Sequence, residues 1–290
     1  MAHHRKGQDV AAVDELRRAI TIAEGDAKPW IELAEIAWTG GDHSSSLTTL
    51  KEGIAANPGN RELQSMYARR LMDEELISEA FPYLLELSVK GYSSEIDLLL
   101  ITAMKHLGME NIDETMEGFI NRYPGDHRFV GEYGSRLVWN GEPEKGLVFL
   151  KSIIAHLAED PAWSLAYVEG VLQPDYLHLV GPAKLSRTEL MFTNELLESV
   201  LIREPENLSA KMLKAEWLLQ SEDFPSAKRM FNTIMDESQG GRDLPSTRLY
   251  AGLAQSAART GEHEIAMAAL EQAISLQPDW YGLLRLKAEF

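Results

Sequence analysis

The sequence predicts an all-α fold built from a repeated helix–turn–helix unit, and three observations support this prediction. Small residues recur with a period of 34, because Ala12, Ser46 and Ala80 are each 34 residues apart. Two distant blocks of the chain carry the same pattern of aromatic, small, large and proline positions. A glycine stands between the two expected helices of a unit and a proline follows the second one, and both residue types commonly end a helix. A 34-residue period accommodates two helices of about 12 to 14 residues and two turns.

The two blocks carry the pattern at identical offsets. They read Trp30-x2-Leu33-Ala34-x2-Ala37, Ser46-x3-Leu50, Gly53, Pro58 and Tyr250-x2-Leu253-Ala254-x2-Ala257, Ala266-x3-Leu270, Ala273, Pro278. Small residues allow two helices to approach closely where they cross, and the large residues fill the hollows beside them. Both blocks closely resemble the tetratricopeptide repeat. The resemblance implies a right-handed superhelical α-solenoid of helix-turn-helix repeats.

Weaker copies of the pattern fill most of the remaining chain and predict a single array over 1–290. The expected units are 5–26 (a second helix only), 27–60, 61–92, 93–126, 127–161, 162–207, 208–246, 247–280 and 281–290 (a partial repeat or cap). In the unit 208–246 the charged Lys214 occupies the usual leucine position, which predicts a tilted or exposed helix there.

An insert at 173–187 breaks the period. The segment is too long for a repeat turn, and it contains two prolines and a glycine, which disfavour a continuous helix. It contains the apolar residues Tyr176, Leu177 and Leu179. Two interpretations stay open. The insert is a loop that a solenoid tolerates on one face, or it folds over the groove or docks a partner.

The two ends of the chain also depart from the pattern. The sequence begins on a second helix, and its last segment carries the apolar residues Leu283, Leu286 and Phe290. Open solenoid ends need polar caps because they expose the stacking face. We therefore expect either a piece of a longer protein or a homodimer formed through the open ends.

The charge balance limits the class of partner. The chain has 28 basic and 45 acidic residues, a net charge of −17, so we expect no binding to nucleic acid or to anionic membranes. The apolar stretch Leu98–Ile101 is far too short to cross a bilayer. We expect protein partners; the acidity serves solubility or favours partners with basic segments. No signal-peptide core is present, and the sequence leaves cytoplasm and periplasm as open alternatives.

No pattern that carries catalysis is recognisable. The sequence has no cysteine, and its eight histidines are scattered apart from His3 and His4. Phosphate-binding loops, nucleophile elbows and zinc-binding histidine pairs on one helix are missing. We therefore expect no catalytic residue, no metal site and no cofactor.

The resemblance implies that the first helix of each repeat lines a concave groove. Carrying its geometry over gives these groove residues: Ile31, Glu35, Trp38, Arg69, Met72, Ile101, Met104, Lys105, Arg128, Trp139, Arg248 and Arg259. Trp38 and Trp139 are expected to anchor a partner, or else to pack between helices. The lysines and asparagines with which some family members clamp a terminal carboxylate are not recognisable. The mixture of aromatic, aliphatic and charged groove residues suits an amphipathic helix or an extended peptide as the ligand.

The leading hypothesis is a non-enzymatic scaffold that binds a peptide or helix of a partner protein in its groove. The alternative is the repeat portion of a larger bacterial machine that assembles, exports or modifies an envelope polymer such as an exopolysaccharide.

Overall fold

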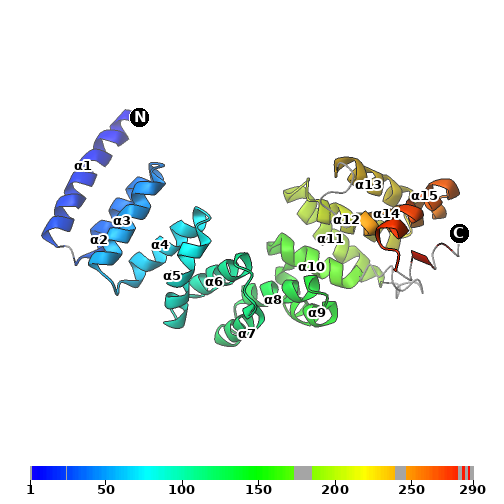
Figure 1. Ribbon diagram of the computed structural model, residues 1–290, viewed down its shortest axis with the longest axis horizontal. Coiled ribbons are helices and arrows are strands. Elements are labelled where there is room, and N and C mark those ends of the chain that lie inside the picture. The colour runs from blue at the N-terminus through cyan, green and yellow to red at the C-terminus, as the bar shows by residue number, and fades with distance from the viewer. Residues whose placement is uncertain are drawn as a thin grey trace. The chain divides into compact units, whose positions relative to one another are not determined.

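The computed structural model describes residues 2–23, 25–172, 185–238, 246–279, 283, 284 and 287. Over these residues it has fifteen α-helices and one 3-10 helix, and no strand (Figure 1). The predicted all-α fold of repeated helix–turn–helix units is thereby confirmed. Contacts divide the chain into two compact units, Met1–Pro124 and Gly125–Phe290. Each unit is described by itself, and the single array over 1–290 stays a prediction.

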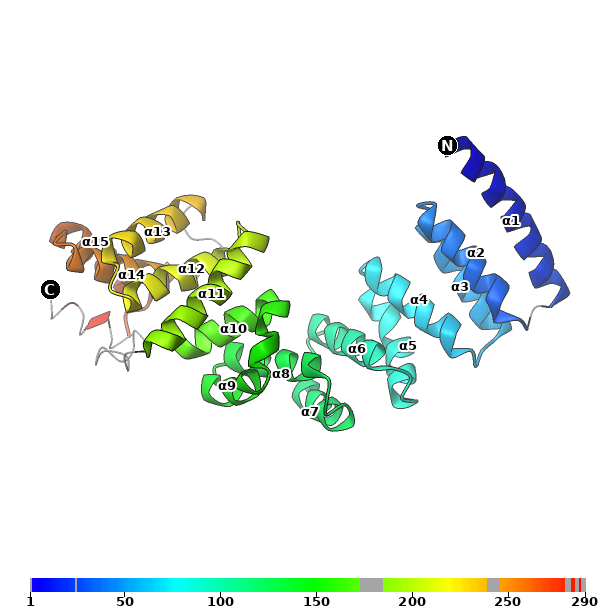
Figure 2. The ribbon, with the colours of Figure 1, turned by 180° about the vertical axis from the view of Figure 1, so that it is seen from behind.

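The first unit consists of one helix followed by three helix pairs, whose neighbours lie side by side (Figure 2). The helices are α1 (Ala2–Ile22), α2 (Ala27–Thr39), α3 (His43–Ala56), α4 (Arg61–Asp73), α5 (Ile77–Val89), α6 (Ser94–His106) and α7 (Ile112–Arg122). The even-numbered helix is the first of each pair.

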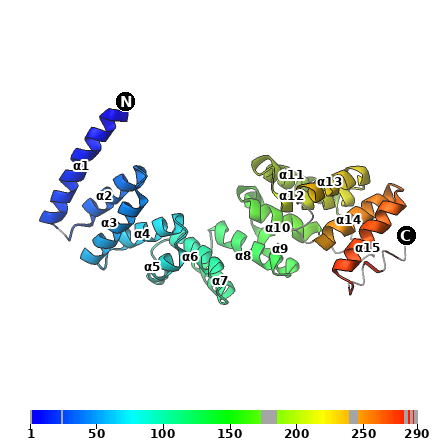
Figure 3. The same cartoon turned by 45° about the horizontal axis from the view of Figure 1, so that its top comes forward.

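The second unit contains four helix pairs (Figure 3). The helices are α8 (His127–Trp139), α9 (Pro143–Ser152), the 3-10 helix η1 (Ile154–Glu159), α10 (Pro161–Leu172), α11 (Arg187–Arg203), α12 (Leu208–Gln220), α13 (Phe224–Glu237), α14 (Ser246–Arg259) and α15 (His263–Leu276). The expected insert residues Tyr176, Leu177 and Leu179 lie outside the described residues.

Side-chain caps begin most of the first helices. Asp26 accepts a hydrogen bond from the Lys28 amide, Asn60 from the Glu62 and Leu63 amides, and Ser93 from the Ile96 amide. Asp126 and Asn207 do the same for α8 and α12. Each cap satisfies an amide that has no partner within its helix, and this fixes where the first helix of a pair begins.

Small buried residues set the distance between the two helices of a pair. Ser46, at the start of α3, is fully buried and its hydroxyl donates to the Ala34 carbonyl of α2 over 2.7 Å. Gly53, one turn beyond Leu50, lies against the ring of Trp30. Close approach of this kind buries the large residues beside the crossing, and the apolar core follows the line of these crossings.

The turn between the helices of a pair needs one residue in the left-handed region. Glycine takes this position at Gly41, Gly141 and Gly261, with φ of 83°, 86° and 80°. In the α4–α5 and α12–α13 turns the same position holds Glu75 and Glu222, with φ of 59° and 64°. A residue with a Cβ atom is strained in this region.

Replacing Glu75 with glycine is therefore expected to raise the free energy of unfolding by up to about 1 kcal/mol. The control is Glu75→Ala, which removes the same charge but keeps the Cβ atom, and it should not stabilise the chain. Urea unfolding of the three proteins measures the difference. Equal stabilities of the glycine and alanine variants would contradict the strain at this turn.

The expectation that Lys214 marks an exposed helix is wrong. Its side chain is only 12% exposed, and α12 buries Ala210, Met212, Leu213 and Ala215 like a regular first helix. The Lys214 ammonium bonds to Glu198 and Asn194 of α11 and lies 4.7 Å from the centre of the Trp217 ring. The long aliphatic stem fills the leucine position while the charged end reaches its partners on α11.

Within the described part of the chain, none of the helices combines the length and the apolar character that crossing a bilayer requires.

Candidate functional site

In each unit, the first helices of successive pairs contact one another. In the first unit α2 contacts α4 and α4 contacts α6; in the second unit α8 contacts α10, α10 contacts α12 and α12 contacts α14. We call the surface formed by each of these two rows the first-helix face of that unit. It is the surface on which the sequence analysis placed the groove residues.

The predicted groove residues differ in their accessibility. Arg69, Lys105, Trp139 and Arg259 are exposed, and Ile31, Glu35, Trp38, Met72, Arg128 and Arg248 are partly buried. Ile101 and Met104 are buried in the core of the first unit, so these two side chains pack between helices and do not line a surface. Trp139 is 49% exposed at the end of α8, and its side chain is therefore available to a partner.

Trp38 is held by side chains of two neighbouring helices. Its ring stacks on the His43 imidazole with centroids 4.0 Å apart, and the Arg70 guanidinium lies 4.2 Å from the ring centre. Arg70 also donates to Glu35 over 2.7 Å, which connects α4 with α2. Trp38 thus takes part in the packing of α2, α3 and α4. Packing between helices was the alternative to a partner anchor that the sequence left open.

An ion cluster connects the three consecutive first helices α10, α12 and α14 of the second unit. Arg248 of α14 donates to both carboxylate oxygens of Glu169 on α10, over 3.0 and 2.8 Å. It also donates twice to Glu216 of α12, with one of these contacts at 2.5 Å. Two bidentate arginine–carboxylate pairs fix both the distance and the orientation of the three helices.

The cluster is largely removed from water. Only 3% of the Glu216 side chain is exposed, against 21% of Arg248 and 19% of Glu169. Burial alone lowers the pKa of the Arg248 guanidinium, but the two carboxylates outweigh it and raise this pKa above its ordinary value. Arg248 therefore stays charged, and the three side chains act as one rigid polar element on the first-helix face.

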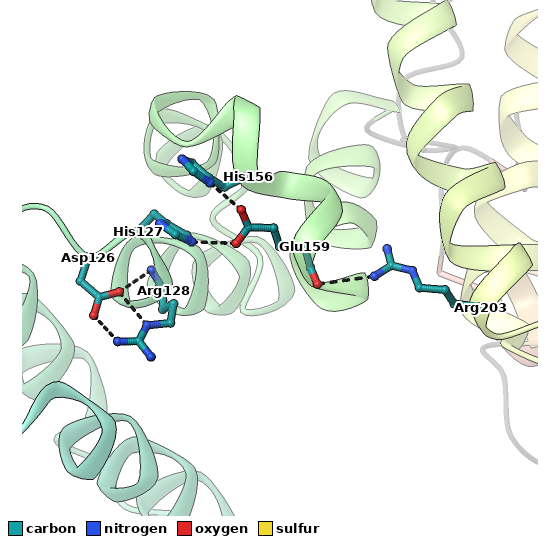
Figure 4. Close-up of polar contacts among 6 residues, drawn as sticks. All are labelled: Asp126, His127, Arg128, His156, Glu159 and Arg203. Atoms are coloured by element: carbon teal, nitrogen blue, oxygen red, sulfur yellow. Dashed lines mark hydrogen bonds and ion pairs between the residues drawn. The ribbon is translucent and has the colours of Figure 1, made fainter.

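A second cluster lies at the start of α8 and contains two histidines and a glutamate (Figure 4). The Glu159 carboxylate of η1 accepts from His127 Nε2 over 2.8 Å and from His156 Nδ1 over 2.6 Å. The two imidazole rings are stacked, with centroids 3.9 Å apart and planes within 9°. Hydrogen bonds from His156 and from His127 hold the pKa of the Glu159 carboxyl below its ordinary value.

Packing around this cluster fixes the elements that carry it. The ring of Trp163 meets His127 edge-on at 6.0 Å and lies over Gly131, one helical turn further along α8. Arg203 of α11 donates to the Ala158 carbonyl over 2.8 Å and holds the last turn of η1. The neighbouring Arg128 is bound by Asp126 over 2.8 and 2.5 Å (Figure 4).

Sequence reasoning missed the glutamates of the ion cluster and the whole histidine cluster. Glu169 and Glu216 are the ninth residues of α10 and α12, the position that the predicted groove residue Glu35 has in α2, so counting from the observed start of each helix finds them. His127 and His156 are 29 residues apart on different elements, and no local spacing signals that they meet.

Comparison with known proteins agrees with this geometry. A sequence model described as the tetratricopeptide repeat matches residues 247–279, the segment that forms α14 and α15. The chain is a tetratricopeptide-repeat protein. Its repeats are of a kind that generally serves as a protein-interaction scaffold, and the predicted family is confirmed.

Solved structures show the same fold for this tetratricopeptide-repeat protein. A tetratricopeptide repeat protein from Parabacteroides merdae is 14% identical with a TM-score of 0.53, covering 90% of this chain and 96% of that one. The C-terminal part of a repeat-containing protein from Cytophaga hutchinsonii is 12% identical with a TM-score of 0.51, covering 88% and 98%. Among curated proteins no sequence matches the chain significantly. At these identities the likeness concerns the fold alone.

Proposed function

We propose that this tetratricopeptide-repeat protein is a non-enzymatic scaffold, and that a helix or an extended segment of a partner protein lies along its first-helix faces. The observation that carries the proposal is the continuity of first helices within each unit, which presents side chains of successive repeats in a row. A row of this kind suits an amphipathic helix or an extended peptide laid along it, two modes in which proteins bind segments of their partners.

The chemistry of the row favours a partner segment with basic residues. The exposed Glu62 belongs to the first helix α4, and the chain as a whole carries a net charge of −17. Complementary charge speeds association and excludes partners of the wrong sign. Trp139 adds a half-exposed aromatic ring to the first-helix face of the second unit, which suits an apolar residue of the same segment.

Replacing Trp139 with alanine is expected to weaken partner binding by about 2 kcal/mol or more, as is usual for an aromatic anchor. Because half of this side chain is already exposed, the thermal unfolding of the variant should stay close to that of the wild type. Calorimetric titration of a captured partner gives the affinity, and circular dichroism gives the unfolding. A stability loss with unchanged affinity would show that Trp139 only packs against its own unit.

A charge-reversal pair tests the choice of face. Glu62 is an exposed residue of the first helix α4, and Glu52 is an exposed residue of the second helix α3. Glu62→Lys and Glu52→Lys change the net charge equally. We expect Glu62→Lys to reduce partner capture from cell extract, quantified by mass spectrometry, and Glu52→Lys to leave it unchanged. The reverse order would place the partner on the second helices.

A further inference from the structure

We propose that His127, His156 and Glu159 form a binding site for a divalent transition-metal ion of the zinc class. Two imidazole nitrogens and one carboxylate are ligands that zinc ions accept in proteins. One ligand atom from each of the three residues lies within 4.8 Å of the others. His127 lies far from His156 and Glu159 in the sequence, and the fold brings the three side chains together at the start of α8 (Figure 4).

The nitrogen–oxygen distances in the cluster are close to those of a metal site. Nε2 of His127 is 2.8 Å from Oε2 of Glu159, and Nδ1 of His156 is 2.6 Å from Oε1. Ligand atoms around a tetrahedral zinc ion with bonds of about 2.0–2.1 Å are about 3.3 Å apart. To admit an ion, the two nitrogen–oxygen contacts need to open by well under 1 Å, and the two nitrogens, which lie within 4.8 Å of each other, must reach the same separation. The ion then replaces the protons that now join each nitrogen to the carboxylate.

The side chains are free to make this adjustment. The exposed fractions of the His127, His156 and Glu159 side chains are 29%, 43% and 54%. The imidazole rings are parallel, so each must turn about χ2 for both nitrogens to face one ion, and this torsion is broad for histidine. The partial exposure also leaves room for water as a fourth ligand.

The backbone that carries the ligands is more firmly held than the side chains. His127 is the first residue of α8, behind the Asp126 cap, and Trp163 packs against the same face of this helix. On the other side of the cluster, Arg203 holds the last turn of η1, the element that carries His156 and Glu159. A bound ion would join the start of a first helix to the segment that follows its second helix, and so would fasten this repeat against opening.

Isothermal titration of the full chain with Zn²⁺ tests the proposal, with Co²⁺ absorption in the visible range as a second measurement. We expect one ion per chain at this site. Removing a group that only supports a metal ligand already costs about 10–100-fold in affinity. His127→Gln, His156→Gln and Glu159→Gln should therefore each weaken Zn²⁺ binding at least tenfold, with circular dichroism confirming that each variant is folded.

Two control variants test whether His43, or His3 and His4, contribute to Zn²⁺ binding. His43 contacts Glu74 over 2.6 Å on the surface of the first unit, which makes His43→Gln the matched variant of a histidine–glutamate pair without a second histidine. His3→Ser/His4→Ser removes the two adjacent histidines of the sequence. Both controls should bind Zn²⁺ as the wild type does. Loss of binding in either control, or equal binding by wild type and His156→Gln, would overturn the proposal.

Discussion

Replacing Arg248 with methionine is expected to lower the free energy of unfolding of the second unit by about 3–5 kcal/mol. The variant leaves the carboxylates of Glu169 and Glu216 close together without the guanidinium that now bonds to both. Glu216 is almost fully buried, so water cannot replace the lost partner. Native-state hydrogen exchange in α10, α12 and α14 measures the effect within this unit.

Two further variants separate burial from charge. Lys145 forms a surface pair with Glu142, and both side chains are well exposed, so Lys145→Met should leave exchange in the second unit nearly unchanged. The triple variant Glu169→Gln/Glu216→Gln/Arg248→Met removes all three charges and should recover much of the loss. A triple variant less stable than Arg248→Met would show that the cluster does not act through uncompensated charge.

Replacing Gly146 with alanine is expected to destabilise the second unit by about 1–3 kcal/mol. The added Cβ atom would lie 2.5 Å from the carbonyl oxygen of Gly134 and 2.9 Å from the amide nitrogen of Val138. Both are backbone atoms of α8, which cannot rotate away, so α8 and α9 must separate. The separation loosens the packing of the buried Leu150. Chemical unfolding of the variant gives the size of the loss.

Gly118→Ala is the matched control for this substitution. Gly118 lies in α7, where an added Cβ atom meets nothing within 4 Å. Alanine loses less backbone freedom on folding than glycine, so this variant should gain about 0.4–1 kcal/mol. Opposite signs for the two variants would confirm that contact between helices, and not helix propensity, decides the Gly146 result. Equal signs would contradict the close approach of α8 and α9.

The fold could be predicted because its repeating constraints are visible in the residue types. A helix crossing favours small residues, so Ser46 and Ala80, which are 34 residues apart and fully buried, reveal the period directly. The turn between paired helices favours glycine, and Gly41 and Gly261 occupy it as the sequence predicts. Glu75 and Glu222 adopt the same backbone conformation, but because neither is a glycine, the sequence does not predict it at these two turns.

The candidate sites were less predictable, because side-chain partners depend on contacts between distant segments. Counting along each first helix reaches Arg248, Glu169 and Glu216 one by one, but it does not show that the three side chains bond to one another across α10, α12 and α14. Register alone also predicts Ile101 and Met104 on the groove, although neighbouring helices cover them. The histidine cluster depends on the meeting of α8 with η1, which no single helix encodes.

Site-specific photo-crosslinking in the source cells tests the central claim most directly, because it locates the binding surface whichever protein the partner is. A photoreactive residue is introduced one position at a time at the exposed sites Arg69 and Arg259 of first helices. The comparison positions are Val148 and Ile265, which are exposed on second helices. Binding along the first-helix faces predicts crosslinks to a protein partner from Arg69 or Arg259 and none from the second-helix positions. Crosslinks confined to Val148 and Ile265 would contradict it.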